Sequence, residues 1–182
     1  VGLDGVVAQQ ANYRRSGFAL AHRNVRLQGV ARHGGSALDA VVDLRSVDWQ
    51  QVLDCDRPCF PAGRDDFLRA WVQQSGHHAL GLVQDGRLVA YGVIRPCQQG
   101  HKIGPLIADD AAQADTLLHA LTARVPAGSA VFIDMPEPNT AAVALAQAHG
   151  MAPMFETARM YQGTPALPDM QRTFGIASFE LG

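Results

Sequence analysis

The chain has 182 residues, of which 47% are hydrophobic and 18% are charged, and its formal net charge is −2. This composition is typical of a folded globular protein and excludes a disordered one. The near-neutral charge provides no general basic field for a nucleic acid or an anionic membrane surface, so we expect neither as a partner.

The cysteine and histidine content argues against disulfides and metal ions. The three cysteines, Cys55, Cys59 and Cys97, are odd in number and do not form a disulfide framework, so we expect a reducing, cytoplasmic setting. The pair His77-His78 and the other histidines lack metal-ligand spacing, so no metal site is expected. No stretch approaches the ~18 uninterrupted apolar residues of a membrane span.

The first 40 residues read as one small unit followed by a linker. An apolar stretch at 2–7 predicts a strand, and the polar stretch after it predicts a helix that stops at Gly17-Phe18. Alternating residues at 18–29 predict a second strand. Residues 31–40 contain Gly34-Gly35-Ser36 and are predicted to be a linker.

Residues 41–182 predict a longer series of elements. A short strand at 41–47 precedes a helix capped by Asp48, and a second helix follows at 64–74. Three consecutive strands between residues 78 and 109 should be antiparallel, with a hairpin turn at Asp85-Gly86.

The rest of this segment alternates between helices and strands. We expect a helix opening near Asp110, a buried strand at 129–135, a helix capped by Asn139, and two closing strands at 154–161 and 174–182. The sequence therefore predicts an α+β fold: a mixed, mostly antiparallel sheet flanked by helices in a three-layer arrangement.

One supersecondary unit occurs twice, at residues 1–26 and 131–161. Each copy has an apolar strand with an aspartate, Asp4 or Asp134, then a short helix, a glycine followed by a bulky apolar residue, and another strand. We matched the arginines Arg23 and Arg159 as the ends of the second strands. The chain is thus expected to contain the end of one domain and the whole of a related one.

The element order and several motifs resemble the GNAT N-acetyltransferases. The stretch "ANYRRSGF" is similar to the closing motif of that family, and residues 91–97, 102–106, 134–139, 156–161 and 174–182 resemble the C-terminal GNAT-like domain of bacterial tandem acetyltransferases. The resemblance implies that residues 1–30 are the last strand, helix and strand of an N-terminal GNAT domain, that 31–40 is the linker, and that 41–182 is the C-terminal GNAT-like domain.

The resemblance also implies a chemistry and its residues. In the family, acetyl-CoA lies in a V-shaped gap between the fourth and fifth strands, with its pyrophosphate on a glycine-rich loop at a helix N-terminus. A tyrosine on the next helix commonly protonates the departing thiolate. Tyr13 matches that tyrosine by position, and the adjacent Asn12 is expected to contact the cofactor. An amphipathic Tyr13, with its ring in the core, is an equally good interpretation.

The complete domain departs from the family pattern in two places. Its loop after the fourth strand, "DDAAQADTLL", has no glycine-rich segment, and its two aspartates, Asp109 and Asp110, would repel a pyrophosphate. Ala146 occupies the position that corresponds to Tyr13 and cannot donate a proton. This domain is therefore expected to be degenerate.

Four further residues are candidates for substrate binding. Arg95, Cys97 and Lys102 cluster at neighbouring strand ends, and Asp134 ends a strand where a carboxylate can meet an amine. A solvated turn with one core-facing thiol, and an Asp134 tied into local backbone bonds, are the competing interpretations.

The leading hypothesis is transfer of acetyl from acetyl-CoA to a primary amine of a small molecule or a protein. The degenerate domain would then support acceptor binding or stability. The alternative is a non-enzymatic ligand-binding or dimerisation module on the same scaffold, since fold alone does not give function. A third possibility is a homodimer in which the first strands pair with a neighbouring chain.

Overall fold

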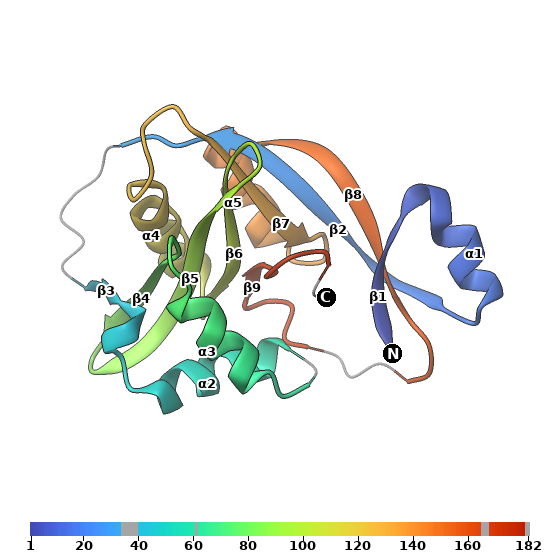
Figure 1. Cartoon of the computed structure of the whole chain (residues 1–182), viewed down its shortest axis with the longest axis horizontal. Coiled ribbons are helices and arrows are strands. Elements are labelled where there is room, and N and C mark those ends of the chain that lie inside the picture. Colours follow the sequence, from blue (N-terminus) through green and yellow to red (C-terminus); the bar gives the residue numbers. More distant parts are fainter. Residues whose placement is uncertain (34–39, 61, 165–167, 181–182) are drawn as a thin grey trace.

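The computed structural model describes residues 1–33, 40–60, 62–164 and 168–180, which form a sheet flanked by helices (Figure 1). The strands in the described residues are β1 Gly2–Val6, β2 Ala19–Val30, β3 Val41–Asp43, β4 His78–Gln84, β5 Arg87–Cys97, β6 Gly100–Ala108, β7 Ala130–Pro136, β8 Ala152–Tyr161 and β9 Thr173–Gly175. The α-helices are α1 Gln10–Arg15, α2 Trp49–Asp56, α3 Asp65–Gln73, α4 Ala111–Thr122 and α5 Thr140–Ala148.

The sheet separates two hydrophobic cores. Side chains of β5 alternate between them: Tyr91 and Val93 pack with the core that contains α2 and α3, whereas Ala90 and Ile94 pack with the core that contains α4. Leu145 of α5 belongs to the second core as well. The predicted fold, a mixed and mostly antiparallel sheet between helical layers, is confirmed.

Local sequence signals position most of these elements. The predicted caps form: Asp48 accepts a hydrogen bond from the Gln50 amide, Asp110 from the Gln113 amide, and Asn139 from the Ala142 amide. β4, β5 and β6 are consecutive antiparallel neighbours, as predicted, and are joined by the Asp85-Gly86 turn between the first two.

The strand order is β1-β8-β2-β7-β6-β5-β4-β3, with β9 attached to β6. β2 therefore lies between β7 and β8, pairing antiparallel with both along most of its length. In Figure 1, β2 and β8 run side by side across the molecule, and α1 projects at the end of the sheet where β1 lies. Residues 1–30 thus share one sheet with the rest of the chain.

The division of the chain into 1–30, 31–40 and 41–182 stays a prediction, and positions 34–39 of the expected linker lie outside the described residues. The strand predicted at 174–182 is shorter than expected, because β9 ends at Gly175 and the segment after it is irregular. Among the described residues, no helix combines the length and the apolar character needed to cross a membrane.

Candidate active site

The strands β6 and β7 are parallel and pair only over a short stretch. Their register runs from His101↔Val131 to Ile103↔Ile133. Beyond this point β9 pairs antiparallel with β6, with Leu106 opposite Gly175, and the amide of Ile176 donates to the carbonyl of Asp134 on β7 (2.9 Å). The C-terminal segment is thus inserted between the fourth and fifth strands of the unit that begins at β3.

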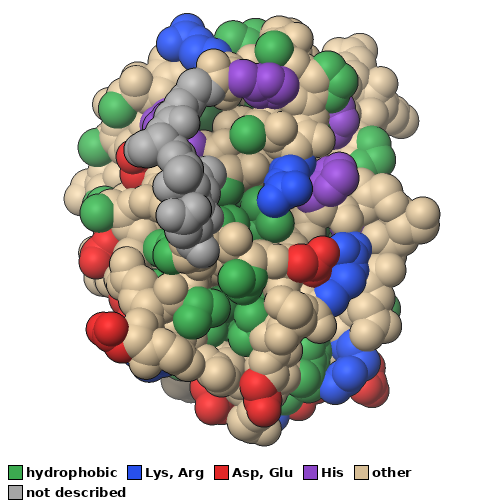
Figure 2. All heavy atoms as spheres, turned by 90° about the vertical axis from the view of Figure 1, so that its left-hand side faces the viewer, with side chains coloured by type: hydrophobic (Ala, Val, Ile, Leu, Met, Phe, Trp, Pro, Cys, Tyr) green, Lys and Arg blue, Asp and Glu red, His purple; other side chains and the backbone are tan. Residues whose placement is uncertain are grey.

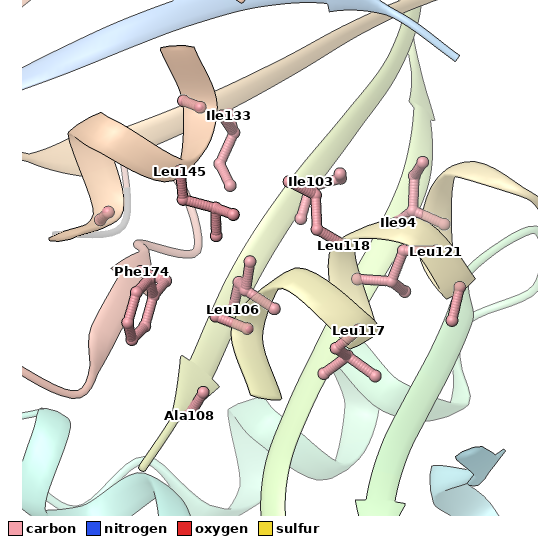
Figure 3. Close-up of a cluster of buried hydrophobic side chains, with 14 of the residues drawn as sticks. Ile94, Ile103, Leu106, Ala108, Leu117, Leu118, Leu121, Ile133, Leu145 and Phe174 are labelled. Atoms are coloured by element: carbon pink, nitrogen blue, oxygen red, sulfur yellow. The ribbon is translucent and has the colours of Figure 1, made fainter. Parts of the chain in front are cut away.

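Several contacts fix this inserted segment. The Asn139 amide group donates from Nδ2 to the carbonyls of Gln171 (3.1 Å) and Thr173 (3.0 Å). Phe174 is 1% exposed. Figure 3 shows its ring among the buried side chains, near Leu106 and Leu145. The gap is filled by packed protein.

Gly104 on β6 shows how close the inserted segment lies. A Cβ atom built at this position would be 2.3 Å from the carbonyl oxygen of Ile176, far inside van der Waals contact. The indole Nε1 of Trp71 donates to the carbonyl of Gly104 from the other direction (3.0 Å). Only a glycine allows the two backbones to approach in this way.

The start of α4, which follows β6, is also satisfied internally. Asp110 accepts from the Gln113 amide (2.8 Å), which occupies one of the free amides of the first turn. Asp109 forms ion pairs with Arg87 (2.6 Å) and Arg172 (2.8 Å). Asp109 therefore engages both nearby arginines and Asp110 occupies an amide of the first turn, and a pyrophosphate at this position would require such amides and cations to be free.

A charged cluster lies where β2, β6 and β7 meet. Asp134 is fully buried and contacts Arg26 Nε (2.7 Å), Arg26 Nη2 (2.9 Å) and Lys102 Nζ (2.5 Å). The ring of Phe179 lies 4.7 Å from the Arg26 guanidinium and 5.5 Å from Lys102 Nζ. Burial lowers the pKa of Lys102, an effect that the Asp134 carboxylate opposes. The hydrogen bond to Asp134 raises the pKa of Arg26.

A second cluster of the same kind lies where β1, β2 and β8 meet. Asp4 accepts from Arg159 Nη1 (2.9 Å), Asn24 Nδ2 (2.6 Å) and Thr157 Oγ1 (3.1 Å). Arg159 also donates to the hydroxyl of Tyr161 (3.1 Å). Burial is the largest influence on the Arg159 guanidinium, yet its pKa is raised, because the hydrogen bonds and the Asp4 carboxylate outweigh it.

The two clusters correct one detail of the repeat. Arg159 lies opposite Asp4, and Arg26 lies opposite Asp134, so the partner of Arg159 in the first copy is Arg26 and the match with Arg23 was wrong. Arg23 instead lies 4.0 Å from Glu156. The second strand of each copy, β2 or β8, therefore supplies an arginine to the aspartate on the first strand of the other copy, β7 or β1.

The structure brings only some of the predicted site residues together. Lys102 and Asp134 form an ion pair, and Arg95 lies opposite Lys102 on β5, with its guanidinium 5.0 Å from the Trp71 ring. Cys97 is the last residue of β5 and is partly exposed.

The other two predicted residues, Tyr13 and Asn12, lie apart from these on α1. The Tyr13 ring contacts Phe18 edge-on, with centroids 6.2 Å apart, and covers Gly5 of β1. Asn12 is exposed and hydrogen-bonds its helix neighbours Gln9 and Arg15. The proposed catalytic and cofactor roles of these two residues stay predictions.

His22 on β2 is a titratable group that sequence reasoning missed. It lines a narrow crevice together with Asn24, Arg159 and Tyr161. Burial lowers its pKa, the Asp4 carboxylate opposes this, and Arg159 reinforces it. A single histidine in a strand carries no local signal of such a position, because the crevice is built from segments far apart in the chain.

The comparison with protein families identifies this architecture. A sequence model of the family described as acetyltransferase (GNAT) domain matches residues 52–175. The chain belongs to the GNAT acetyltransferase family. The GNAT element order was predicted, whereas the insertion of the C-terminal segment between β6 and β7 was not.

Known proteins resemble the whole chain. Holothin acyltransferase of Pseudoalteromonas sp. (strain SANK 73390) is 29% identical over 182 residues, which cover 62% of that protein. A solved structure from Pyrococcus horikoshii with an acetyltransferase assignment has a TM-score of 0.83 at 22% identity, covering 98% of this chain and 58% of that one.

A GNAT-family structure from Novosphingobium aromaticivorans has a TM-score of 0.57 at 16% identity, over 81% of this chain and 69% of that one. At these identities the structural likenesses show the fold alone. The GNAT chain described here spans about three fifths of the length of its curated relative and of the Pyrococcus protein.

Proposed function

We propose that this GNAT-type acyltransferase is the C-terminal part of a tandem protein that transfers acetyl from acetyl-CoA to a primary amine of a small molecule or a protein. In this proposal the complete unit, 41–182, is degenerate, and acetyl-CoA binds in the sister unit whose closing elements are β1, α1 and β2. We expect the protein to be cytoplasmic, since its cysteines are free.

The observation that carries the proposal is the insertion of the C-terminal segment between β6 and β7. Acetyl-CoA occupies this gap in the family, and here Phe174 and the Gly104–Ile176 contact fill it. The start of α4 argues against the second requirement, a site for the pyrophosphate, because Asp109 engages Arg87 and Arg172 and Asp110 occupies an amide of the first turn. A cofactor site in the sister unit is then the remaining location for the family's chemistry.

Three observations support the tandem arrangement. Each Asp–Arg cluster joins an aspartate on the first strand of one copy of the repeat to an arginine on the second strand of the other copy. The family model matches residues 52–175, so the elements β1, α1 and β2 fall outside the matched part. The two relatives that match 100% and 98% of this chain are both longer than it.

The proposed roles follow from these positions. Tyr13 would protonate the CoA thiolate, and Asn12 beside it would contact the cofactor. Arg95 and Cys97 would contact the acceptor; the Nε atom of Arg95 is buried and has no hydrogen-bond partner among the described residues. Lys102 and Asp134, at 5% and 0% exposure, would contribute to acceptor binding by holding β6 and β7 in place.

Calorimetric titration with acetyl-CoA tests the location of the cofactor site. The 182-residue chain should show no saturable binding, and the longer tandem protein should bind one acetyl-CoA per chain. Two equivalents per tandem chain, or tight binding by the 182-residue chain, would contradict a filled and degenerate gap.

Steady-state kinetics of the longer tandem protein, which carries the proposed cofactor site, test Tyr13. Tyr13→Phe keeps the ring that packs on Gly5 and removes the hydroxyl, so kcat should fall about 100-fold or more with little change in stability. The matched control is Arg14→Ala, an exposed substitution on the same helix. The acceptor panel should contain small-molecule amines, peptide amines and holothin, the compound in the name of the relative. An unchanged kcat in Tyr13→Phe would exclude the hydroxyl as the acid.

A non-enzymatic dimerisation module is the second candidate, and the edge of the sheet at β1 favours it. In the described residues β1 pairs with β8 alone, and Val1, Val6 and Leu20 nearby are 86%, 39% and 47% exposed. Such an edge favours addition of a further strand. A monomer by light scattering, together with CoA release on any amine, would rule this candidate out.

A further inference from the structure

Two histidines and an aspartate meet where α4 and α5 pack together. Asp115 and His119 come from α4, and His149 follows the last residue of α5. One potential metal-ligand atom from each of the three side chains lies within 4.8 Å of the others. His149 Nε2 is 2.5 Å from Asp115 Oδ1, and His119 Nδ1 is 3.5 Å from the same oxygen. This cluster lies away from the filled gap between β6 and β7.

The helix geometry explains why two of these groups face the third. Residues four apart on a helix lie one above the other on the same face, as Asp115 and His119 do. His119 Nδ1 also lies 3.1 Å from the carbonyl oxygen of Asp115, a contact that fixes the orientation of the ring.

The cluster borders a cavity of about 340 Å³ that is also lined by Gly29, Arg32, Thr122 and Met151. The side chains are half-buried: His149 is 20% exposed, and Asp115 and His119 are 45% and 42% exposed. The cavity has room for water molecules, which complete the coordination of a metal that has three protein ligands. Figure 2 shows several histidine side chains at the surface on the face of the molecule where α4 lies.

We infer that Asp115, His119 and His149 form a binding site for a divalent transition-metal ion, of which zinc and nickel fit the ligands best. Two imidazoles and one carboxylate select such ions over magnesium and calcium, which prefer oxygen ligands throughout. The cavity is lined by the carboxylate of Asp115 and by one guanidinium, that of Arg32. The bound ion would link α4 to α5, which cover the same face of the sheet.

The competing interpretation is a metal-free contact. Asp115 accepts a hydrogen bond from His149, and the two imidazole rings pack edge to face with centroids 4.5 Å apart. The expectation of no metal site came from spacing along the sequence. It could not anticipate that helix packing brings His149 to Asp115, which is 34 residues away in the sequence.

Zinc and nickel chlorides, added separately to tag-free and metal-free protein, test the inference. We expect one equivalent of zinc per chain by elemental analysis after dialysis, and a rise in melting temperature with added zinc. His119→Ala and His149→Ala should each lower the affinity about tenfold or more, measured by competition with a chromogenic chelator. His78→Asn, an exposed histidine on β4, is the matched control and should bind zinc as the wild type does.

Asp115→Asn separates the two interpretations, because the amide oxygen retains an acceptor for His149 while the ligand charge is lost. The metal site predicts weaker zinc binding in this variant, at an unchanged melting temperature without metal. Less than stoichiometric binding by the wild type would overturn the inference. So would zinc binding that is equal in the wild type, His119→Ala and His149→Ala.

Discussion

The two copies of the strand-helix-strand repeat follow the same path in very different surroundings. In the copy at 131–161, the helix α5 buries Ala142, Leu145 and Ala146. In the copy at 1–26, no side chain of the helix α1 is buried by the described residues. Both helices end at a glycine with positive φ, Gly17 (85°) and Gly150 (70°), followed by an apolar residue. The repeated sequence pattern thus sets the chain path, and the neighbouring elements set the burial.

The same contrast holds for the two Asp–Arg clusters. Asp134 holds two cations, Arg26 and Lys102, in the middle of the sheet. Asp4 holds one cation, Arg159, and receives two neutral donors at the end of the sheet. Both aspartate side chains are fully buried, so the two clusters differ in the number of cations that each aspartate holds.

The largest effect should come from removing the two aspartates one at a time. Asp134→Ala leaves Lys102 and Arg26 without their counterion and should lower the free energy of unfolding by about 3–5 kcal/mol. Asp4→Ala should lower the free energy of unfolding by less, about 1–3 kcal/mol. It leaves one cation, Arg159, without its counterion, and Arg159 keeps its hydrogen bond to the Tyr161 hydroxyl. Urea unfolding of both variants provides the measurement.

Equal losses in Asp134→Ala and Asp4→Ala would show that the two clusters are energetically equivalent, against this comparison. Asp134→Asn is the control for size, because it keeps the volume and one acceptor oxygen. It should fall between the wild type and Asp134→Ala.

The second comparison concerns one phenylalanine near each copy of the repeat, Phe174 and Phe18. Phe174 fills the gap between β6 and β7, and Phe174→Ala should cost about 3–5 kcal/mol, as for other buried phenylalanines. Phe18 is partly exposed and contacts Tyr13 edge-on, so Phe18→Ala should cost about 1 kcal/mol. Urea unfolding measures both losses in the free energy of unfolding, from the shift of the midpoint at an unchanged slope of the free energy against urea concentration.

A loss below about 1 kcal/mol in Phe174→Ala would mean that the inserted segment is not part of the packed core. In that case the gap could open to a ligand, and the proposal of a degenerate unit would lose its main support. Phe18→Ala serves as the reference for an aromatic side chain at the open end of the sheet.

Local signals in the sequence allowed much of the fold to be predicted. Asp48, Asp110 and Asn139 cap helices because each sits one residue before the helix and its side chain reaches a free amide. The hairpin at Asp85-Gly86 and the three antiparallel strands follow from turn chemistry and alternation in the same way. These features need information from a few neighbouring residues only.

Long-range pairing accounts for what the sequence did not reveal. Nothing within β2 indicates that it lies between β7 and β8, and nothing within β9 indicates that it enters the gap beside β6. Arg26 was missed at the candidate site for the same reason, since its partner Asp134 is 108 residues away. Asp134 and Lys102 were proposed as site residues because each lies near the end of a recognisable strand in the sequence.

The smallest effect concerns acid stability and compares a histidine near each end of the sheet. Burial lowers the pKa of His77, which packs edge-on against Trp71 and lies 2.8 Å from the Trp71 carbonyl through Nδ1. That hydrogen bond raises the pKa, and Arg95 and Arg45 lower it further. His22, beside Asp4 and Arg159, also has a lowered pKa because of burial.

Both histidines bind a proton less readily in the folded chain than in the unfolded one. The unfolded chain therefore takes up more protons as the pH falls below about 6.5, the ordinary pKa of histidine, and stability decreases toward the folded pKa. His77→Gln and His22→Gln should each make the urea midpoint less sensitive to pH in this range. His78→Gln, at an exposed position, should leave the wild-type slope unchanged. A steeper loss on acidification in His77→Gln would mean that protonation of His77 stabilises the fold, opposite to the effect expected from its burial.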